Sequence, residues 1–311
     1  MSVRVGLVGT GHWARTVHAE SLSSYGAVDF VGIWGRNSVE REDLARKFAT
    51  ISFESYEDLL AGVDVVDFAI APEAQRGFAV RAALSGKSLL LEKPLALTVA
   101  DASCLVRAVS DAGVRAVVFL TRLFDPVRSR WLAEQFDQGW TSARAVHCSS
   151  ALVGGSPYAA CAWRQAGGAL WDIGPHVLSQ LVPVLGPIDS VRVTSYEKRG
   201  ITELSFWHEG GGESTARMTL HGDPVDGQDW IEFSDGRESR RSPMVPMDFV
   251  HSHTLAMRAL IEGGEPGDPH LVGLPYGVGA SLESIRVLSV VESVMAGGYR
   301  SDERVAIGGM S

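Results

Sequence analysis

The chain has 311 residues, of which 45% are hydrophobic and 21% charged, the composition of an ordinary soluble globular protein with room for two domains. Its formal net charge of −9 argues against a nucleic-acid partner, since sequence-independent binding of nucleic acid needs a basic face. The 3 cysteines are too few for a disulfide framework or a zinc cluster. Neither a signal peptide nor an apolar stretch of bilayer length is evident, so we expect a cytoplasmic protein without a membrane partner.

Residues 1–121 alternate short apolar runs with helical patterns, which predicts a doubly wound parallel sheet covered on both faces. The predicted strands are Val3–Val8, Val28–Trp34, Val63–Ile70, Ser88–Leu91 and Arg115–Leu120. The predicted helices are Trp13–Tyr25, Ser38–Ala49 with Ser38 as its N-cap, Ala74–Leu84 and Val99–Gly113.

Residues 122–311 have a different pattern, in which polar and apolar residues alternate with few helices between them. The alternating runs cover residues 143–153, 190–198, 202–209, 214–222 and 229–236. Turn signals separate them at Glu209–Ser214, Asp226-Gly227 and Asp235-Gly236. We therefore predict an α+β domain with a large, mainly antiparallel sheet, framed by helices near Gly168–Leu185, Phe249–Glu262 and Val278–Met295.

A glycine-rich turn follows the first predicted strand. The run Gly9-Thr10-Gly11-His12-Trp13-Ala14 is G-x-G-x-x-A, directly before a helix. Its first glycine permits a tight turn, its second lets the backbone approach a pyrophosphate, and the helix N-terminus offers free N–H groups to the anion. This context predicts a dinucleotide site contacted by Gly9, Thr10, Gly11, His12 and Trp13, against the alternative of a turn with no ligand.

The end of the second strand bears on the choice of cofactor. NAD-binding domains usually carry a carboxylate there for the adenine ribose, but the segment Trp34–Ser38 has none. It offers Arg36 and Asn37 instead, and a guanidinium can bind a 2′-phosphate through two hydrogen bonds. We predict that NADP(H) is preferred and NAD(H) is possible; the alternative is that Arg36 is only a solvated loop residue.

A second candidate site lies in the segment Trp163–Ser179. Asp172 and His176 are four residues apart, so on a helix they share one face, where histidine is a common general acid or base. The alternative is a surface ion pair, and Pro175 between them can kink the helix. The pair in His251-Ser252-His253 has no evident third ligand, so no metal site is predicted.

The stretch Ser88–Thr98 places Glu92, Lys93 and Pro94 directly after an apolar run, which taken alone is typical of a strand that surfaces with two solvated charges. Combined with Gly9–Ala14 and Gly167–His176, this tripeptide resembles the glucose–fructose oxidoreductase/inositol dehydrogenase/MocA (Gfo/Idh/MocA) family of NAD(P)-dependent oxidoreductases. The resemblance implies a Rossmann domain over residues 1–121. It also implies a substrate-binding and oligomerisation domain over residues 122–311, whose sheet would form a homodimer or homotetramer.

The resemblance also implies roles for single residues. Lys93 would contact the reacting substrate oxygen and the nicotinamide, after a cis Lys93–Pro94 bond. His176 would exchange a proton with that oxygen, and Asp172 would hold a neighbouring hydroxyl. Arg164 would reach the cofactor, and Glu92 would contact the cofactor ribose or pair with Lys93.

The turn after the third strand departs from the family pattern. Many members have a Thr-Pro-Asn-type turn ending in histidine, where this chain has Ala71–Arg76; only Pro72 matches, and Ala71 and Pro72 remain candidate cofactor contacts. We predict an NADP(H)-dependent oxidoreductase acting on a sugar, nucleotide-sugar or cyclitol. The alternatives are a reductase of a non-sugar carbonyl, C=C or C=N bond, and a catalytically silent dinucleotide-binding regulator.

Overall fold

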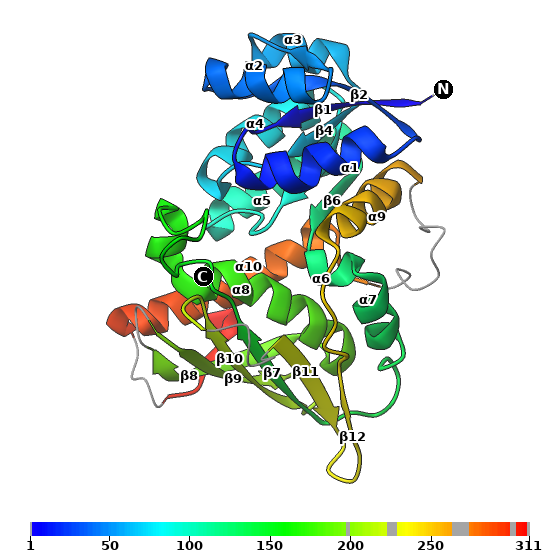
Figure 1. Cartoon of the computed structure of the whole chain (residues 1–311). Helices are drawn as coiled ribbons and strands as arrows, with labels where there is room; N and C mark the ends of the chain where they lie inside the picture. The colour runs from blue at the N-terminus through cyan, green and yellow to red at the C-terminus, as the bar shows by residue number, and fades with distance from the viewer. Residues whose placement is uncertain (1, 197–199, 223–228, 263–273, 299–302, 310–311) are drawn as a thin grey trace. The chain divides into compact units, whose positions relative to one another are not determined.

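A computed structural model describes residues 2–196, 200–222, 229–262, 274–298 and 303–309 (Figure 1). The chain forms two compact units. The first runs to Asp125 and also includes Tyr276–Leu282 and helix α9 (Phe249–Glu262), while the second holds Pro126–Pro246 and the chain from Glu283 onward. This division differs from the predicted one at residue 121, because α9 returns to the first unit. The turn predicted at Asp226-Gly227 lies outside the described residues.

The first unit is built on a six-stranded parallel sheet of order β3-β2-β1-β4-β5-β6, as predicted for a doubly wound fold. Its strands are β1 (Val3–Val8), β2 (Val28–Trp34), β3 (Ile51–Ser52), β4 (Val65–Phe68), β5 (Ser88–Glu92) and β6 (Ala116–Phe119). Its helices are a π-helical turn (Ala14–His18) leading into α1 (Ala19–Ser24), α2 (Ser38–Lys47), α3 (Tyr56–Gly62), α4 (Pro72–Leu84), α5 (Val99–Ala112), α6 (Thr121–Phe124) and α9.

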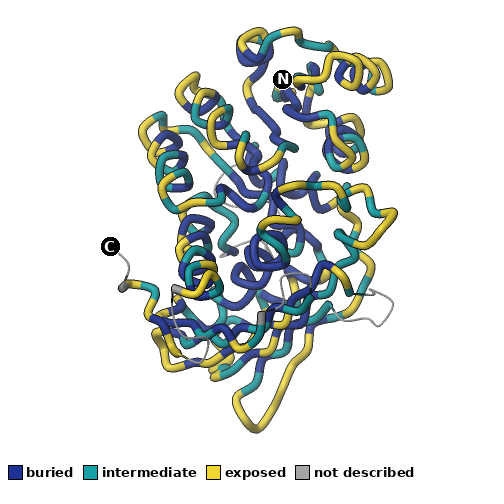
Figure 2. Tube along the Cα trace, turned by 90° about the vertical axis from the view of Figure 1, so that its left-hand side faces the viewer, coloured by how far each residue is buried: buried dark blue, intermediate teal, exposed yellow. Residues whose placement is uncertain are grey.

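The central strands are apolar because both faces of the sheet are covered. Leu89, Leu90 and Leu91 of β5 are each 0% exposed, and Figure 2 shows buried residues along the strands and exposed ones along the outer turns of the helices. The N-cap of α2 is Asn37 rather than the predicted Ser38. Its side chain accepts hydrogen bonds from the backbone N–H groups of Val39 and Glu40.

The second unit contains a seven-stranded sheet of order β12-β11-β7-β10-β9-β8-β13. The pair β7–β10 is parallel and the other pairs are antiparallel, so the sheet is mainly antiparallel as predicted. Its strands are β7 (Ser142–Cys148), β8 (Ile188–Tyr196), β9 (Thr202–His208), β10 (Glu213–Thr219), β11 (Asp229–Ser234), β12 (Ser239–Arg241) and β13 (Val305–Ala306). The remaining helical segments are α7 (Pro126–Ala133), α8 (Ala162–Leu185), α10 (Val278–Ser293), a π-helical turn (Val294–Gly298) and a 3₁₀ turn (Ile307–Gly309).

Helix α8 packs against strands β7, β9 and β10 of this sheet. Strand β9 alternates buried and half-buried residues along its whole length, which is the pattern expected when one face is covered and the other is not. Across the residues that the structure describes, no helix is long and apolar enough to cross a bilayer.

Candidate functional site

The glycine turn after β1 has the geometry of an anion cradle. Gly9 has a φ of 136°, and a Cβ placed on it would lie 2.4 Å from the carbonyl oxygen of Ala69, so only glycine fits there. A Cβ placed on Gly11 would meet nothing within 4 Å. The second glycine is therefore not required by packing within the protein; it leaves open space above the turn, where the backbone is accessible to a ligand.

A cavity of about 450 Å³ opens beside this turn. It lies at the carboxyl ends of β1, β2 and β4, where the strand order reverses and where dinucleotides bind in such sheets. Its lining residues are Gly9, Thr10, Gly11, Trp34, Gly35, Arg36, Asn37, Glu40, Ala69, Ile70, Ala71, Ala74 and Phe78. The glycine cradle and the cavity together fit a dinucleotide.

Several predicted cofactor contacts therefore line one cavity: Gly9, Thr10, Gly11, Arg36, Asn37 and Ala71. Pro72 is not among its lining residues. It is buried and occupies the first turn of α4, where its missing N–H has no helical partner to lose.

One lining residue was not predicted. Glu40 lies in the first turn of α2, and its Oε2 accepts a hydrogen bond of 2.8 Å from the Thr10 hydroxyl. A ribose-binding carboxylate is usually found at the end of β2, whereas this one reaches the cavity from the following helix. The spacing Asn37-x-x-Glu40, typical of a helix start, is the signal that would have found it. The cavity thus holds both a guanidinium, on Arg36, and a carboxylate.

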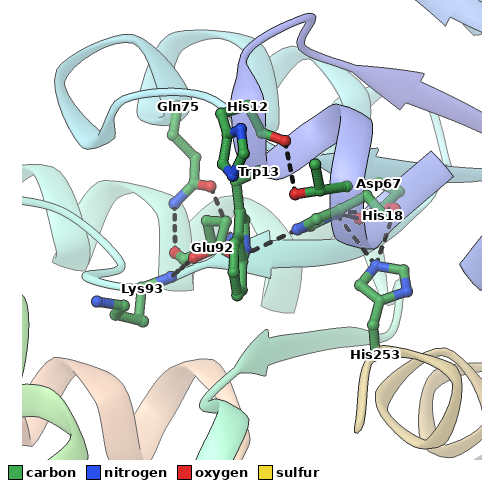
Figure 3. A network of polar contacts seen from close by, with 9 residues as sticks. His12, Trp13, His18, Asp67, Gln75, Glu92, Lys93 and His253 are labelled. Atoms are coloured by element: carbon green, nitrogen blue, oxygen red, sulfur yellow. Dashed lines mark hydrogen bonds and ion pairs between the residues drawn. The ribbon is translucent and has the colours of Figure 1, made fainter. Parts of the chain in front are cut away.

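Glu92 anchors the end of β5 (Figure 3). Its Oε1 accepts hydrogen bonds from Trp13 Nε1 at 2.7 Å and His18 Nε2 at 3.1 Å, and its Oε2 accepts one from the backbone N–H of Lys93 at 3.1 Å. The Gln75 side chain binds the Glu92 backbone, accepting from its N–H at 2.9 Å and donating to its carbonyl at 2.8 Å. Both carboxylate oxygens are thus engaged by protein donors, so Glu92 holds Lys93 in place.

Trp13, predicted to contact the cofactor, directs its indole N–H to Glu92 and packs edge-on against Phe249 of α9, with the ring centroids 5.2 Å apart. His12 is exposed on the glycine turn. The Lys93–Pro94 bond is cis, as the resemblance implied. Cofactor contacts by His12, Trp13, Glu92 and Lys93 stay predictions.

His18 connects Glu92 to Asp67. Its Nδ1 lies 2.9 Å from Asp67 Oδ1, and its Nε2 faces Glu92. Burial disfavours a charged imidazole, but the two carboxylates outweigh it and raise the pKa of His18 to about 9. The end of β5 is therefore tied electrostatically to the buried centre of β4.

In the second unit, helix α8 carries the other candidate residues. Its non-helical point is Gly168, with a φ of 58°, and the helix then continues through Pro175 to Leu185. Asp172 and His176 thus lie one turn apart on a continuous helix, and both are buried, at 6% and 5% exposure. Pro175 does not break the helix between Asp172 and His176.

Arg164 is paired with Asp172. The distance from Arg164 Nε to Asp172 Oδ2 is 3.1 Å, and the guanidinium lies 4.4 Å from the centroid of the Trp163 ring and 4.7 Å from that of Tyr158. Burial works against its charge, yet Asp172 and Cys161 raise the pKa of Arg164. The Arg164 side chain thus positions the Asp172 carboxylate, and the cofactor contact that the resemblance implied for Arg164 stays a prediction.

Residues 3–120 match the family model GFO_IDH_MocA, described as an oxidoreductase family with an NAD-binding Rossmann fold. An uncharacterized oxidoreductase of Synechocystis is 27% identical over 199 residues, which cover 61% of this chain and 53% of that protein. Glucose-6-phosphate 3-dehydrogenase of Bacillus subtilis is 28% identical over 113 residues, 36% of this chain and 32% of that enzyme. The chain spans about half the length of the first of these relatives.

Solved structures share the fold across both units. An oxidoreductase of Thermotoga maritima superposes with a TM-score of 0.80 at 18% identity, covering 99% of each chain. The WlbA dehydrogenase of Bordetella pertussis, in complex with NADH and UDP-GlcNAcA, gives a TM-score of 0.76 at 19% identity, over 98% of this chain and 99% of that one. At these identities the likeness establishes the fold alone.

Proposed function

We propose that this chain, whose residues 3–120 match the Gfo/Idh/MocA oxidoreductase family with an NAD-binding Rossmann fold, is a dehydrogenase or reductase. It would exchange a hydride between a nicotinamide cofactor and the CH–OH or C=O carbon of a sugar, nucleotide-sugar or cyclitol. The observation that carries this proposal is a pair of features within the first unit. The Gly9–Gly11 cradle opens into a cavity at the strand-order reversal, and Glu92 holds Lys93 at the end of β5.

In this proposal Gly9, Thr10 and Gly11 hold the pyrophosphate, through backbone N–H groups at the start of the following helix. The bound nicotinamide supplies or accepts the hydride. The Lys93 ammonium stabilises negative charge that develops on the substrate oxygen, which lowers the cost of removing its proton. His176 exchanges that proton, and Asp172, held by Arg164, accepts a hydrogen bond from a substrate hydroxyl.

NADP(H) is the proposed preferred cofactor, with NAD(H) as the second. Arg36 supports this choice because its guanidinium lines the cavity and is exposed, with no carboxylate at the end of β2. Glu40 works against it, since a carboxylate in the same cavity repels a 2′-phosphate and can accept hydrogen bonds from an unphosphorylated ribose. The hydrogen bond from Thr10 holds Glu40 in place, so the balance between Arg36 and Glu40 decides the preference.

The substrate class is proposed by analogy with a relative that is named as a glucose-6-phosphate 3-dehydrogenase and with a structural neighbour that is in complex with UDP-GlcNAcA. The test is to mix purified protein with NADPH or NADH and a panel of keto-sugars, sugar phosphates, nucleotide-sugars and inositols, following the absorbance of the reduced nicotinamide. Turnover only with simple aldehydes, enones or imines would favour the alternative reductase. Tight cofactor binding without turnover on any compound would favour a silent regulator.

Two substitutions test the residue roles. Lys93→Ala and His176→Ala should each lower kcat by at least about a hundredfold while leaving cofactor affinity within about threefold of wild type. Lys47→Ala, which removes an exposed lysine that pairs with Glu20, is the matched control and should leave kcat unchanged. Wild-type kcat in both test variants would refute the assignment.

The partner proposed for the second unit is a further copy of the same chain. Strand residues on one face of the seven-stranded sheet form a hollow of about 240 Å³, lined by Arg144, Thr194, Glu203, Ser205 and Arg217 among others. Two tryptophans in this sheet, Trp207 and Trp230, lie beneath arginine side chains. Light scattering after gel filtration would give the mass; a monomer at micromolar concentration would refute the dimer or tetramer.

A further inference from the structure

Three buried side chains from distant parts of the sequence meet in the first unit (Figure 3). His18 ends the π-helical turn before α1, Asp67 lies within β4, and His253 lies on α9. All three are 0% exposed. The pair His251-Ser252-His253 offered no third ligand in the sequence, and the structure separates the pair: His251 is exposed, whereas His253 turns inward to two other potential ligands.

The three facing atoms form a nearly equilateral triangle. His18 Nδ1 lies 3.1 Å from His253 Nε2 and 3.1 Å from Asp67 Oδ2, and His253 Nε2 lies 3.0 Å from Asp67 Oδ2. Donors held about 2.0–2.1 Å from a tetrahedral zinc ion are separated by about 3.3–3.4 Å. The triangle is within a few tenths of an ångström of that spacing, so a small outward shift of the side chains would accommodate the ion.

Protons satisfy this triangle less completely than a cation does. If both facing nitrogens carry hydrogen, each can donate to its own oxygen of Asp67, but the two N–H groups then lie side by side at 3.1 Å. If His253 Nε2 carries none, its lone pair lies 3.0 Å from the Asp67 carboxylate. A single cation at the centre would be favourable to all three lone pairs, and one carboxylate with two neutral imidazoles is a ligand set that suits zinc.

The surroundings of His18 match those of a metal-bound histidine. Its Nδ1 faces the triangle, while its Nε2 lies 3.1 Å from Glu92 Oε1. A histidine that binds a metal through one ring nitrogen typically donates its other N–H to a carboxylate, which fixes the tautomer and the ring orientation. Glu92 is in turn held by hydrogen bonds with Trp13 and Gln75. The Nδ1 of His253 has no hydrogen-bond partner among the described residues, so its own outer shell is incomplete.

From this geometry we propose that His18, Asp67 and His253 bind one Zn²⁺ ion, with Glu92 orienting His18 from the second shell. The fourth position would be taken by water or by the second oxygen of Asp67, whose Oδ1 also faces His18 Nδ1 at 2.9 Å. The site is structural: it ties α9, which follows strands β7 to β12 in the chain, to β4 and to the helix after the glycine turn. This role is independent of the hydride-transfer activity proposed above.

Metal content is the first measurement. Protein produced in zinc-supplemented medium and purified without chelator should contain about one Zn²⁺ per chain by mass spectrometry of the metal. Dialysis against a chelator and return of Zn²⁺ should lower and then restore Tm by at least about 4 °C. Co²⁺ added to the stripped protein should give visible absorption bands of a low-coordinate site. These measurements use the wild-type chain and do not depend on any variant folding.

His253→Gln tests the ligand set, and His251→Gln is its matched control, because it makes the same change on the same helix at an exposed position. The control should retain full zinc content and the Tm response. His253→Gln keeps a side chain that can donate to Asp67, so it should fold, lose the zinc and show no response to the chelator. A wild-type chain that holds no zinc and gains no stability on zinc addition would overturn the proposal and leave a purely hydrogen-bonded cluster. Equal zinc content in both variants would overturn the ligand assignment.

Discussion

Replacing each of the two glycines of the turn by alanine separates the two roles that the structure gives them. Gly9 has a φ of 136°, and its added Cβ would lie 2.4 Å from the backbone oxygen of Ala69. Gly11 has an ordinary φ, and its added Cβ would meet nothing within 4 Å. Gly9→Ala should therefore damage the fold, whereas Gly11→Ala should damage only the binding of a dinucleotide.

The magnitudes follow from these contacts. A backbone conformation that only glycine readily adopts costs other residues about 1–3 kcal/mol. Displacing a packed backbone carbonyl adds about 1–3 kcal/mol, so Gly9→Ala should lose about 2–6 kcal/mol of a total stability near 5–15 kcal/mol. Gly11→Ala, at a compatible position, should be neutral or gain up to about 1 kcal/mol through the unfolded chain. Its methyl group would occupy the space above the turn and weaken cofactor binding at least about tenfold, or ~1.4 kcal/mol.

Both effects can be measured on the same samples. Urea unfolding followed by circular dichroism gives stability, and cofactor affinity comes from quenching of tryptophan fluorescence, since Trp34 lines the cavity. Wild-type stability for Gly9→Ala would refute the strain and clash argument. Wild-type cofactor affinity for a folded Gly11→Ala would refute the anion cradle itself, and with it the assignment of the cavity to a dinucleotide.

Three further predictions concern charge. Arg36→Ala should lower the affinity for NADPH relative to NADH by about tenfold or more, and Glu40→Gln should shift the ratio the other way; an unchanged ratio in both, measured by titration, would remove the cavity charges from cofactor choice. Arg164→Leu should destabilise the chain by about 3 kcal/mol, because Asp172 loses this partner, and should leave cofactor affinity unchanged. A loss of cofactor affinity at unchanged Tm would instead support a direct contact between Arg164 and the cofactor. Burial lowers the pKa of His208, so the unfolded chain takes up a proton on this imidazole at a higher pH than the folded chain does. The contribution of His208 to stability is complete above about pH 6.5, the ordinary pKa of histidine, and falls as the pH drops toward the folded pKa. The stability advantage of wild type over His208→Gln should therefore shrink between about pH 7.5 and 5 in urea titrations, and a constant difference would contradict the sign.

Local pattern was sufficient where one segment determines its own structure. The run Val3–Val8 followed by Gly9–Ala14 is a strand, a turn and a helix start whatever surrounds it, and the structure has all three, with a π-helical turn at Ala14–His18. Strands β12 and β13 were missed because each is three residues or fewer and is defined by its partner strand. Strand β12 pairs with β11 across a hairpin and β13 pairs with the distant β8, and the periodicity within such short segments does not predict these pairings.

The membership of α9 in the first unit was not predictable from its own sequence either, because it depends on contacts with α1, β5 and β6. A signal for those contacts did exist. Asp67 stands inside the apolar run of β4, and a carboxylate in a strand covered on both faces must have a charged or hydrogen-bonding partner. The sequence therefore indicates that Asp67 needs a partner. It does not indicate that His18 and His253 are the partners, because both lie far from Asp67 in the chain and no local pattern connects them.

Glu92 shows how the cofactor turn and Lys93 come to depend on one another. Its Oε1 holds Trp13, which is part of the glycine-turn motif, and its Oε2 holds the backbone N–H of Lys93. A carboxylate that accepts from both cannot move toward one without loosening the other. Glu92 and Lys93, which taken alone are typical of a strand that surfaces with two solvated charges, therefore have separate roles. The Glu92 carboxylate is buried at 9% exposure and positions the backbone, and the Lys93 ammonium has the catalytic role proposed above. Glu92→Gln keeps a side chain of the same shape but weakens both bonds, so it should reduce cofactor affinity and kcat together, whereas Lys93→Ala should reduce kcat alone. A Glu92→Gln variant in which only cofactor affinity or only kcat falls would refute this coupling.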